Sequence, residues 1–255
     1  MTDESADEAE TETYDTSYGD VHTFMRAPQG EPDSLSGDVD VGFVGVPFDG
    51  GVTREPGARH GPSAVREASG WHGRRFHSDR ESVSLPSEQT SSYGGVTLRD
   101  CGDAPIVPND IVETGKKVTN YVESVAQGTM PVVIGGDHYI TYPSFVGYAN
   151  TVGDDVGLIH LDAHSDTSDD SDLYGEHYHG SPMVRIDETE HGSYHGGITS
   201  TDLLRAVDLL GQCDAIGAAD MMEVAPRLDS SNTTSLLASN AVGRFLEAKF
   251  AEPAG

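Results

Sequence analysis

Residues 156–166 read VGLIHLDAHSD, an apolar run that leads straight into acids and imidazoles at alternate positions. The apolar part, residues 156–161, predicts a buried strand with Asp162, His164 and Asp166 at its carboxyl end. Carboxylate and imidazole ligands suit Mn²⁺, Co²⁺ or Zn²⁺ better than Ca²⁺. A polar turn with solvated acids is the alternative, but the strand that leads into it favours a metal site.

A second apolar run, residues 130–134, ends in the tetrapeptide GGDH at residues 135–138. The glycines allow a close backbone turn, and the carboxyl ends of parallel strands meet at one edge of a sheet. We therefore expect His138 beside Asp162 as a further metal ligand, with Asp137 orienting a ligand from behind. Taken alone, the tetrapeptide also fits a capping or core histidine.

Two later segments add polar side chains. His179 lies in the loop HYHGSP at residues 177–182, where an imidazole can shuttle protons or steady a substrate. Glu223 follows the apolar run at residues 215–221, where a carboxylate can pair with a cationic substrate. An exposed loop histidine and a surface glutamate are the alternative interpretations.

Strand patterns alternate with helical ones along the chain. Continuous apolar strands between helices predict an α/β fold whose mostly parallel sheet is covered on both faces. We expect a single domain at residues 38–255, preceded by an acidic disordered arm at residues 1–37. Strands are expected at residues 39–46, 96–100, 130–134, 156–161 and 215–221, and helices at residues 63–68, 109–127, 140–148, 201–210 and 234–250.

Local signals refine these elements. Asn109 or Asp110 is expected to cap the second helix and Ser200 the fourth, while the polar residues 78–95 are expected to form a loop. The two cysteines, Cys101 and Cys213, are too few for a disulfide framework and are expected to be buried.

The charge is strongly negative, with 15 basic and 43 acidic residues giving −28. Such a charge repels nucleic acid and anionic membranes and attracts small cations. Adaptation to a salt-rich (halophilic) cytoplasm explains acids spread along the chain better than substrate steering does, and the two are compatible. No apolar run is long enough to span a bilayer, and the acidic N-terminus is no signal or transit peptide, so we expect a cytoplasmic protein.

Several blocks, in this order, resemble those of the ureohydrolases, the family of arginase, agmatinase, guanidinobutyrase and formimidoylglutamase. They extend over most of the chain, and the first looks most like the agmatinase branch. The blocks are GVPFDGGVTREPGARHGPSAVREAS (45–69), GGDHYITYP (135–143), HLDAHSDT (160–167), HGSPM (179–183), GGITSTDLL (196–204) and DMMEVAP (220–226).

The resemblance implies a three-layer α/β/α arginase-like fold, two Mn²⁺ ions per subunit and a trimer or hexamer. Asp162 would bridge the two metals and take part in catalysis, and His179 would assist the chemistry. Glu223 would bind the guanidinium group of the substrate. The metal ligands implied by the resemblance are His138, Asp162, His164 and Asp166.

One block of the family is missing from this sequence, an Asp-x-Asp pair after another buried strand. The chain instead runs directly into the GGITSTDLL block, which predicts an internal deletion with a join near Tyr194 and His195. The sheet would lack two or three strand–helix units of roughly 30 residues each. The second metal would keep few ligands, with His191 and His195 as substitutes.

The expected function is the metal-dependent hydrolysis of a guanidino carbon–nitrogen bond. Agmatine, giving putrescine and urea, is the first expectation for the substrate, and guanidinobutyrate is the competitor. The alternative is a catalytically impaired ureohydrolase that binds one metal or none.

Overall fold

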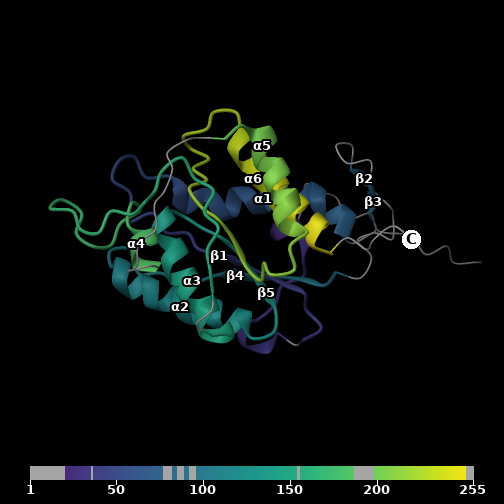
Figure 1. Cartoon of the computed structure of the whole chain (residues 1–255), viewed down its shortest axis with the longest axis horizontal. Helices are drawn as coiled ribbons and strands as arrows, with labels where there is room; N and C mark the ends of the chain where they lie inside the picture. Colours follow the sequence, from purple (N-terminus) through teal and green to yellow (C-terminus); the bar gives the residue numbers. More distant parts are fainter. Residues whose placement is uncertain are drawn as a thin grey trace, which may run out of the picture.

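The computed structural model describes residues 21–35, 37–76, 82–84, 89–91, 96–153, 156–186 and 198–250. Its centre is a four-stranded sheet with the order β4-β1-β5-β6, in which every neighbouring pair is parallel. The α/β fold with a parallel sheet is therefore confirmed (Figure 1). The strands are β1 Val41–Gly45, β4 Leu98–Asp103, β5 Met130–Ile134 and β6 Ala219–Met221.

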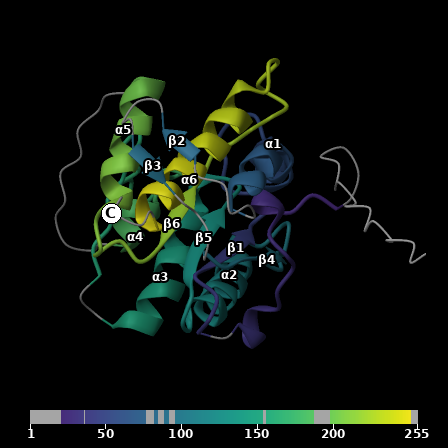
Figure 2. The ribbon, with the colours of Figure 1, turned by 90° about the vertical axis from the view of Figure 1, so that its right-hand side faces the viewer.

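Helices cover both faces of this sheet, as Figure 2 shows. Helices α1, α5 and α6 lie over one face, and α2 and α3 lie over the other. The three-layer arrangement is therefore confirmed. The α-helices are α1 Gly61–Phe76, α2 Ile111–Ala126, α3 Thr141–Val152, α4 Pro182–Ile186, α5 Ser200–Gly211 and α6 Thr233–Phe250, and the 3₁₀ helices are η1 Phe24–Arg26, η2 Pro32–Ser34, η3 Ala58–His60 and η4 His138–Ile140.

The strand β1 shows why its sequence is apolar throughout. Side chains alternate across a strand, so Val41 and Phe43 join the core beneath α1 and α6, whereas Val44 and Val46 join the core beneath α2. All four side chains are completely buried. Full burial of each contributes roughly 1.5–3 kcal/mol, which holds the two helical layers to the sheet.

The strand expected at residues 156–161 is wrong. These residues form no regular structure, and Leu158, Ile159 and Leu161 are 40%, 57% and 45% exposed. Strand β6 stands at the edge of the sheet, and no strand of the described residues pairs with its outer side. A continuous apolar run becomes a strand only where a neighbour completes its hydrogen bonds, and residues 156–161 pair with no strand of the described part of the chain.

Part of the expected N-terminal arm packs against the domain. Phe24, Met25 and Ala27 are each 1% exposed, and the backbone N–H of Phe24 donates to Asp100 Oδ2 at 2.8 Å. The Arg66 guanidinium lies 4.3 Å from the centre of the Phe24 ring. The prediction of an arm rested on the many acidic residues and did not weigh these few apolar ones. Residues 1–20 of the expected arm lie outside the described part of the chain.

Smaller differences concern element ends. Strands β2 (Ser82–Ser84) and β3 (Gln89–Ser91) pair antiparallel inside the stretch expected to be a loop. Asp110, not Asn109, caps α2, and Thr199, not Ser200, caps α5. Cys101 is buried as expected, but Cys213 is exposed. Within the described residues, no helix is long and apolar enough to cross a membrane.

Candidate metal centre

The end of β5 delivers His138 to the carboxyl edge of the sheet. The chain turns so tightly there that only glycine fits at position 136. A Cβ on Gly136 would lie only 1.5 Å from the carbonyl oxygen of Phe48. Asp137 then accepts hydrogen bonds from the backbone N–H groups of Gly51 at 2.7 Å and Tyr139 at 3.1 Å. Asp137 thus fixes the turn that carries His138, whose side chain is buried.

Burial strongly affects the carboxyl group of Asp137. It raises the pKa of Asp137 to about 7, against the opposing effect of the two backbone hydrogen bonds. Asp137 was expected to orient a metal ligand. In the structure it accepts hydrogen bonds from backbone N–H groups around His138 and not from the His138 ring.

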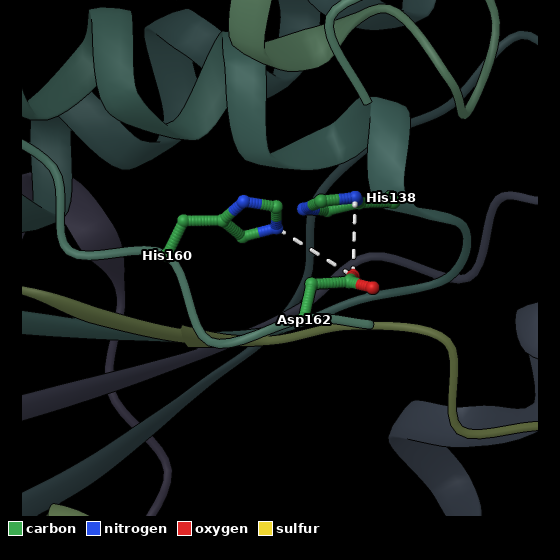
Figure 3. Close-up of side chains that lie close together, drawn as sticks. All are labelled: His138, His160 and Asp162. Atoms are coloured by element: carbon green, nitrogen blue, oxygen red, sulfur yellow. Dashed lines mark ion pairs between the residues drawn. The ribbon is translucent and has the colours of Figure 1, made fainter. Parts of the chain in front are cut away.

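Two imidazoles and one carboxylate meet beside this turn (Figure 3). Asp162 Oδ2 lies 3.7 Å from His138 Nδ1 and 3.5 Å from His160 Nε2. The two rings stack, with centres 4.9 Å apart. Among the described residues, these three form the group whose ligand atoms all lie within 4.8 Å of one another and could hold a metal ion.

Asp162 is the negative centre of this group. Burial by itself would raise its pKa, but the imidazole of His160 and the backbone N–H of His164 stabilise the charged form. Together with the charge of His138 they hold the pKa of Asp162 well below its usual range. The carboxylate therefore stays ionised and ready to bind a cation.

Asp166 also lies in the site, where it contacts the imidazole of His138 directly. Its Oδ2 is 2.5 Å from His138 Nδ1. Burial would lower the pKa of His138, yet the hydrogen bond and the charge of Asp166, followed by the charges of Asp220 and Asp162, raise it. Asp166 also has a positive φ of 47°, a conformation that few non-glycine residues adopt, so the backbone is bent to bring this carboxylate inward.

His164, the other sequence-predicted ligand, lies at the rim. Its side chain is 77% exposed, and its Nδ1 is 3.4 Å from Asp162 Oδ1. The structure thus gathers His138, Asp162 and Asp166, but places His164 outside the group and His160 inside it. Our sequence reasoning missed His160, because its spacing of two residues from Asp162 is shared by His164 and does not distinguish the two.

Glu223, two residues after β6, and His179, in the loop before α4, lie next to this group. Glu223 Oε1 accepts a hydrogen bond from the backbone N–H of His138 at 2.9 Å and lies 3.4 Å from His179 Nδ1. The Glu223 hydrogen bond raises the pKa of His179. The other ring nitrogen of His179 lies 3.0 Å from Thr53 Oγ1, so the imidazole is held at both ends.

Other expected features fall elsewhere. His191, His195 and the join expected near Tyr194 and His195 lie outside the described residues. Their role as substitute ligands stays a prediction.

A three-layer α/β/α fold with imidazoles and carboxylates at the carboxyl edge of its sheet defines a candidate metal-binding α/β protein. The profile of the Arginase family matches residues 39–195 and 192–247, and the chain belongs to this family. The resemblance to ureohydrolases is thereby confirmed. The two matched segments overlap at residues 192–195.

Similar proteins include several amidine hydrolases. A guanidinopropionase of Pseudomonas aeruginosa is 36% identical over 173 residues, which make up 67% of this chain and 50% of the relative. The mitochondrial agmatinase of Gallus gallus is 37% identical over 152 residues, 59% of this chain and 42% of the relative. The chain spans about half the length of the curated relatives it matches.

A solved structure gives the same fold. The Trypanosoma cruzi formiminoglutamase with Mn²⁺ superposes with a TM-score of 0.70 and 19% sequence identity, over 86% of this chain and 96% of that one. At this identity the likeness establishes the arginase-like fold alone.

Proposed function

We propose that this chain hydrolyses the carbon–nitrogen bond of a small cationic guanidino compound, with agmatine as the first candidate. The observation that carries the proposal is the position of Glu223, whose carboxylate stands beside His138 and His179 at the edge of the metal group. Membership of the arginase family supports the reaction class.

Glu223 is the proposed substrate anchor. A carboxylate binds a planar guanidinium well, because two N–H groups can donate to its two oxygens. The Glu223 side chain is 40% exposed, so an incoming ligand can reach it. The net charge of −28 adds a general attraction for cations.

His179 is the proposed proton carrier. Glu223 Oε1 beside Nδ1 raises the pKa of this imidazole, so His179 holds a proton more readily than an ordinary histidine does. From that position a proton can pass to the amine that leaves the guanidino carbon.

The donor set fits one divalent ion. Imidazole and carboxylate are ligands for Mn²⁺, Co²⁺ or Zn²⁺, and His138, His160 and Asp162 converge with ligand atoms close enough for one ion. An ion held there would acidify water and polarise the guanidino group. No second group of this kind occurs in the part of the chain that the structure describes, so the expected pair of ions stays a prediction, as does the full ligand set with His164 and Asp166.

Charge favours agmatine over the competing substrates. Agmatine carries two positive charges, whereas guanidinobutyrate and guanidinopropionate each carry a carboxylate besides the guanidinium. The carboxylates of Asp162 and Asp166 lie beside His138 in the site and disfavour the carboxylate that each of these two competitors carries.

A second candidate function is a catalytically impaired family member that binds one ion. It is favoured by the single group of metal ligands among the described residues. We also propose that the protein is cytoplasmic and forms a homo-oligomer. Light scattering during gel filtration would test the oligomeric state.

Urea release separates the two candidates. The purified chain is first loaded with Mn²⁺. Agmatine, guanidinobutyrate and guanidinopropionate are then each added in a separate assay, and urea is measured over time. Release from agmatine that is lost in Glu223→Gln supports the enzyme. No urea from any of the three, under salt conditions where circular dichroism shows a folded chain, rejects the enzyme and supports the impaired member.

A further inference from the structure

The loop that joins β1 to η3 is closed by a buried carboxylate. Asp49 Oδ2 accepts hydrogen bonds from the backbone N–H groups of Gly57 at 2.8 Å and of Arg59 at 3.2 Å. Asp49 Oδ1 accepts another from the Arg59 guanidinium. The Asp49 side chain is completely buried, whereas half of the Arg59 side chain is exposed. Asp49 therefore ties the two ends of the loop together and fixes its shape.

Gly51 attaches this closed loop to two parts of the site. Its backbone N–H donates to Asp137 Oδ2 at 2.7 Å, and its carbonyl oxygen accepts from the backbone N–H of His179 at 2.9 Å. A Cβ at position 51 would lie 3.0 Å from Asp137 Oδ2 and 3.2 Å from the His179 backbone nitrogen. The backbone of the loop thus passes very close to both segments and is held beside His179.

Thr53, two residues further along the loop, reaches the His179 ring. Its Oγ1 lies 3.0 Å from Nε2, while Glu223 Oε1 lies 3.4 Å from Nδ1. An ionised carboxylate only accepts hydrogen bonds, so Nδ1 carries the N–H of the neutral ring and Nε2 presents its lone pair to Thr53. A hydroxyl can donate to that lone pair, and it can also accept from Nε2–H once the ring is protonated. Thr53 can therefore keep one contact in both states of the ring.

We propose that Thr53 is a positioning residue for His179: its hydroxyl holds Nε2 whether or not the ring carries a second proton, and the loop closed by Asp49 holds Thr53. The part of His179 as proton carrier belongs to the proposed function, and the catalytic role of Thr53 rests on it. The hydrogen bond from Thr53 to His179 is independent of that function.

Diethyl pyrocarbonate tests the contact without any substrate. This reagent acylates an imidazole nitrogen through its free lone pair, so a lone pair that accepts a hydrogen bond reacts slowly. The full chain is treated near neutral pH, and fragment mass spectrometry follows the modification of His179 over time. His164, whose side chain is 77% exposed, serves as the internal reference.

Thr53→Val removes the hydroxyl and keeps the shape of the side chain. Relative to His164, His179 should be modified about three- to tenfold faster in this variant, since one neutral hydrogen bond is worth about that factor. Thr53→Ser keeps a hydroxyl and should stay within about twofold of wild type. Thr151→Val, the same change near the end of α3, is the control and should also stay within about twofold. An unchanged rate in Thr53→Val, or an equal rise in Thr53→Ser, overturns the proposal.

Urea release tests the catalytic role. Thr53→Val should lower kcat by about three- to tenfold and leave KM within about twofold, because Glu223 remains to bind the substrate. Thr53→Ser should restore kcat. An unchanged kcat in Thr53→Val would overturn the positioning role. No urea from wild type would reject the proposed function, whereas the reagent experiment still decides whether Thr53 holds His179.

Discussion

Glu223 connects the end of strand β6 to two histidines of the site. Its carboxylate accepts from the backbone of His138, lies 3.4 Å from His179 Nδ1, and belongs to a residue with a positive φ of 61°. Because a non-glycine residue rarely adopts that φ, the backbone conformation is part of what aims the carboxylate. Among the causes that raise the pKa of His179, the hydrogen bond of Glu223 is the largest.

Replacing Glu223 should change the titration of His179. In Glu223→Gln the imidazole loses its anionic partner, so its pKa should fall toward the ordinary value. The ring-proton chemical shift of His179, followed by NMR against pH, measures the change. Glu176→Gln, an exposed carboxylate in the same loop, is the control and should leave the titration unaltered.

The same pair sets a direction for stability against pH. A histidine whose pKa is raised in the folded state contributes stability below its ordinary pKa of 6.5, and that contribution is lost as pH rises through the raised value. The difference in unfolding free energy between wild type and Glu223→Gln should therefore shrink above neutral pH. A difference that grows with pH would contradict the pairing.

At the scale of single elements, helix α2 depends on its first turn. Asp110 Oδ1 accepts from the backbone N–H of Glu113 at 2.8 Å, whereas Asn109 precedes the cap. Asp110→Ala should lower the unfolding free energy by about 1 kcal/mol. Asn109→Ala, a neighbouring exposed change, should stay within about 0.5 kcal/mol. Denaturant unfolding measures both, and equal losses would argue against the assigned cap.

The apolar segment 156–161 and strand β5 are both apolar in sequence but differ in burial. Ile134 in β5 is completely buried, whereas Ile159 is 57% exposed. Ile134→Ala should cost about 2–5 kcal/mol, but Ile159→Ala should cost no more than about 0.5 kcal/mol. A large loss in Ile159→Ala, measured by the same unfolding experiment, would mean that the segment is covered in solution.

At the scale of the whole molecule, the net charge of −28 works against compactness. The screening length falls from about 10 Å at 0.1 M salt to about 3 Å at 1 M, so raising KCl over this range should raise the Tm at pH 7. Near pH 4.4, the pI of the sequence, the same step should change the Tm little. An equal gain at both pH values would show that the salt acts through apolar burial instead.

Local patterns predicted most of the fold well. Strand β5 coincides with the expected residues 130–134, and α2 and α6 match their periodic patterns within two residues at each end. These elements depend on side chains that are close in the sequence. The expected strand at residues 156–161 was wrong because an apolar run does not reveal whether a neighbouring strand exists.

The candidate site was predicted in part. His138, Asp162 and Asp166 do come together, and Glu223 lies beside His179. The choice between His160 and His164 was beyond the sequence, because both stand two residues from Asp162. Only the path of the backbone after residue 156, which belongs to no strand of the described sheet, decides which imidazole turns inward.

The sequence by itself determined the family, the alternation of strands and helices, and the gathering of acids and imidazoles at the carboxyl edge of the sheet. These follow from motifs and periodicities that are local in the chain. The tertiary structure alone decided that the described sheet ends at β6, that residues 156–161 stay unpaired, and that His160 faces Asp162. Those outcomes depend on which distant segments are present to pair and pack, and pairing is a property of the whole fold.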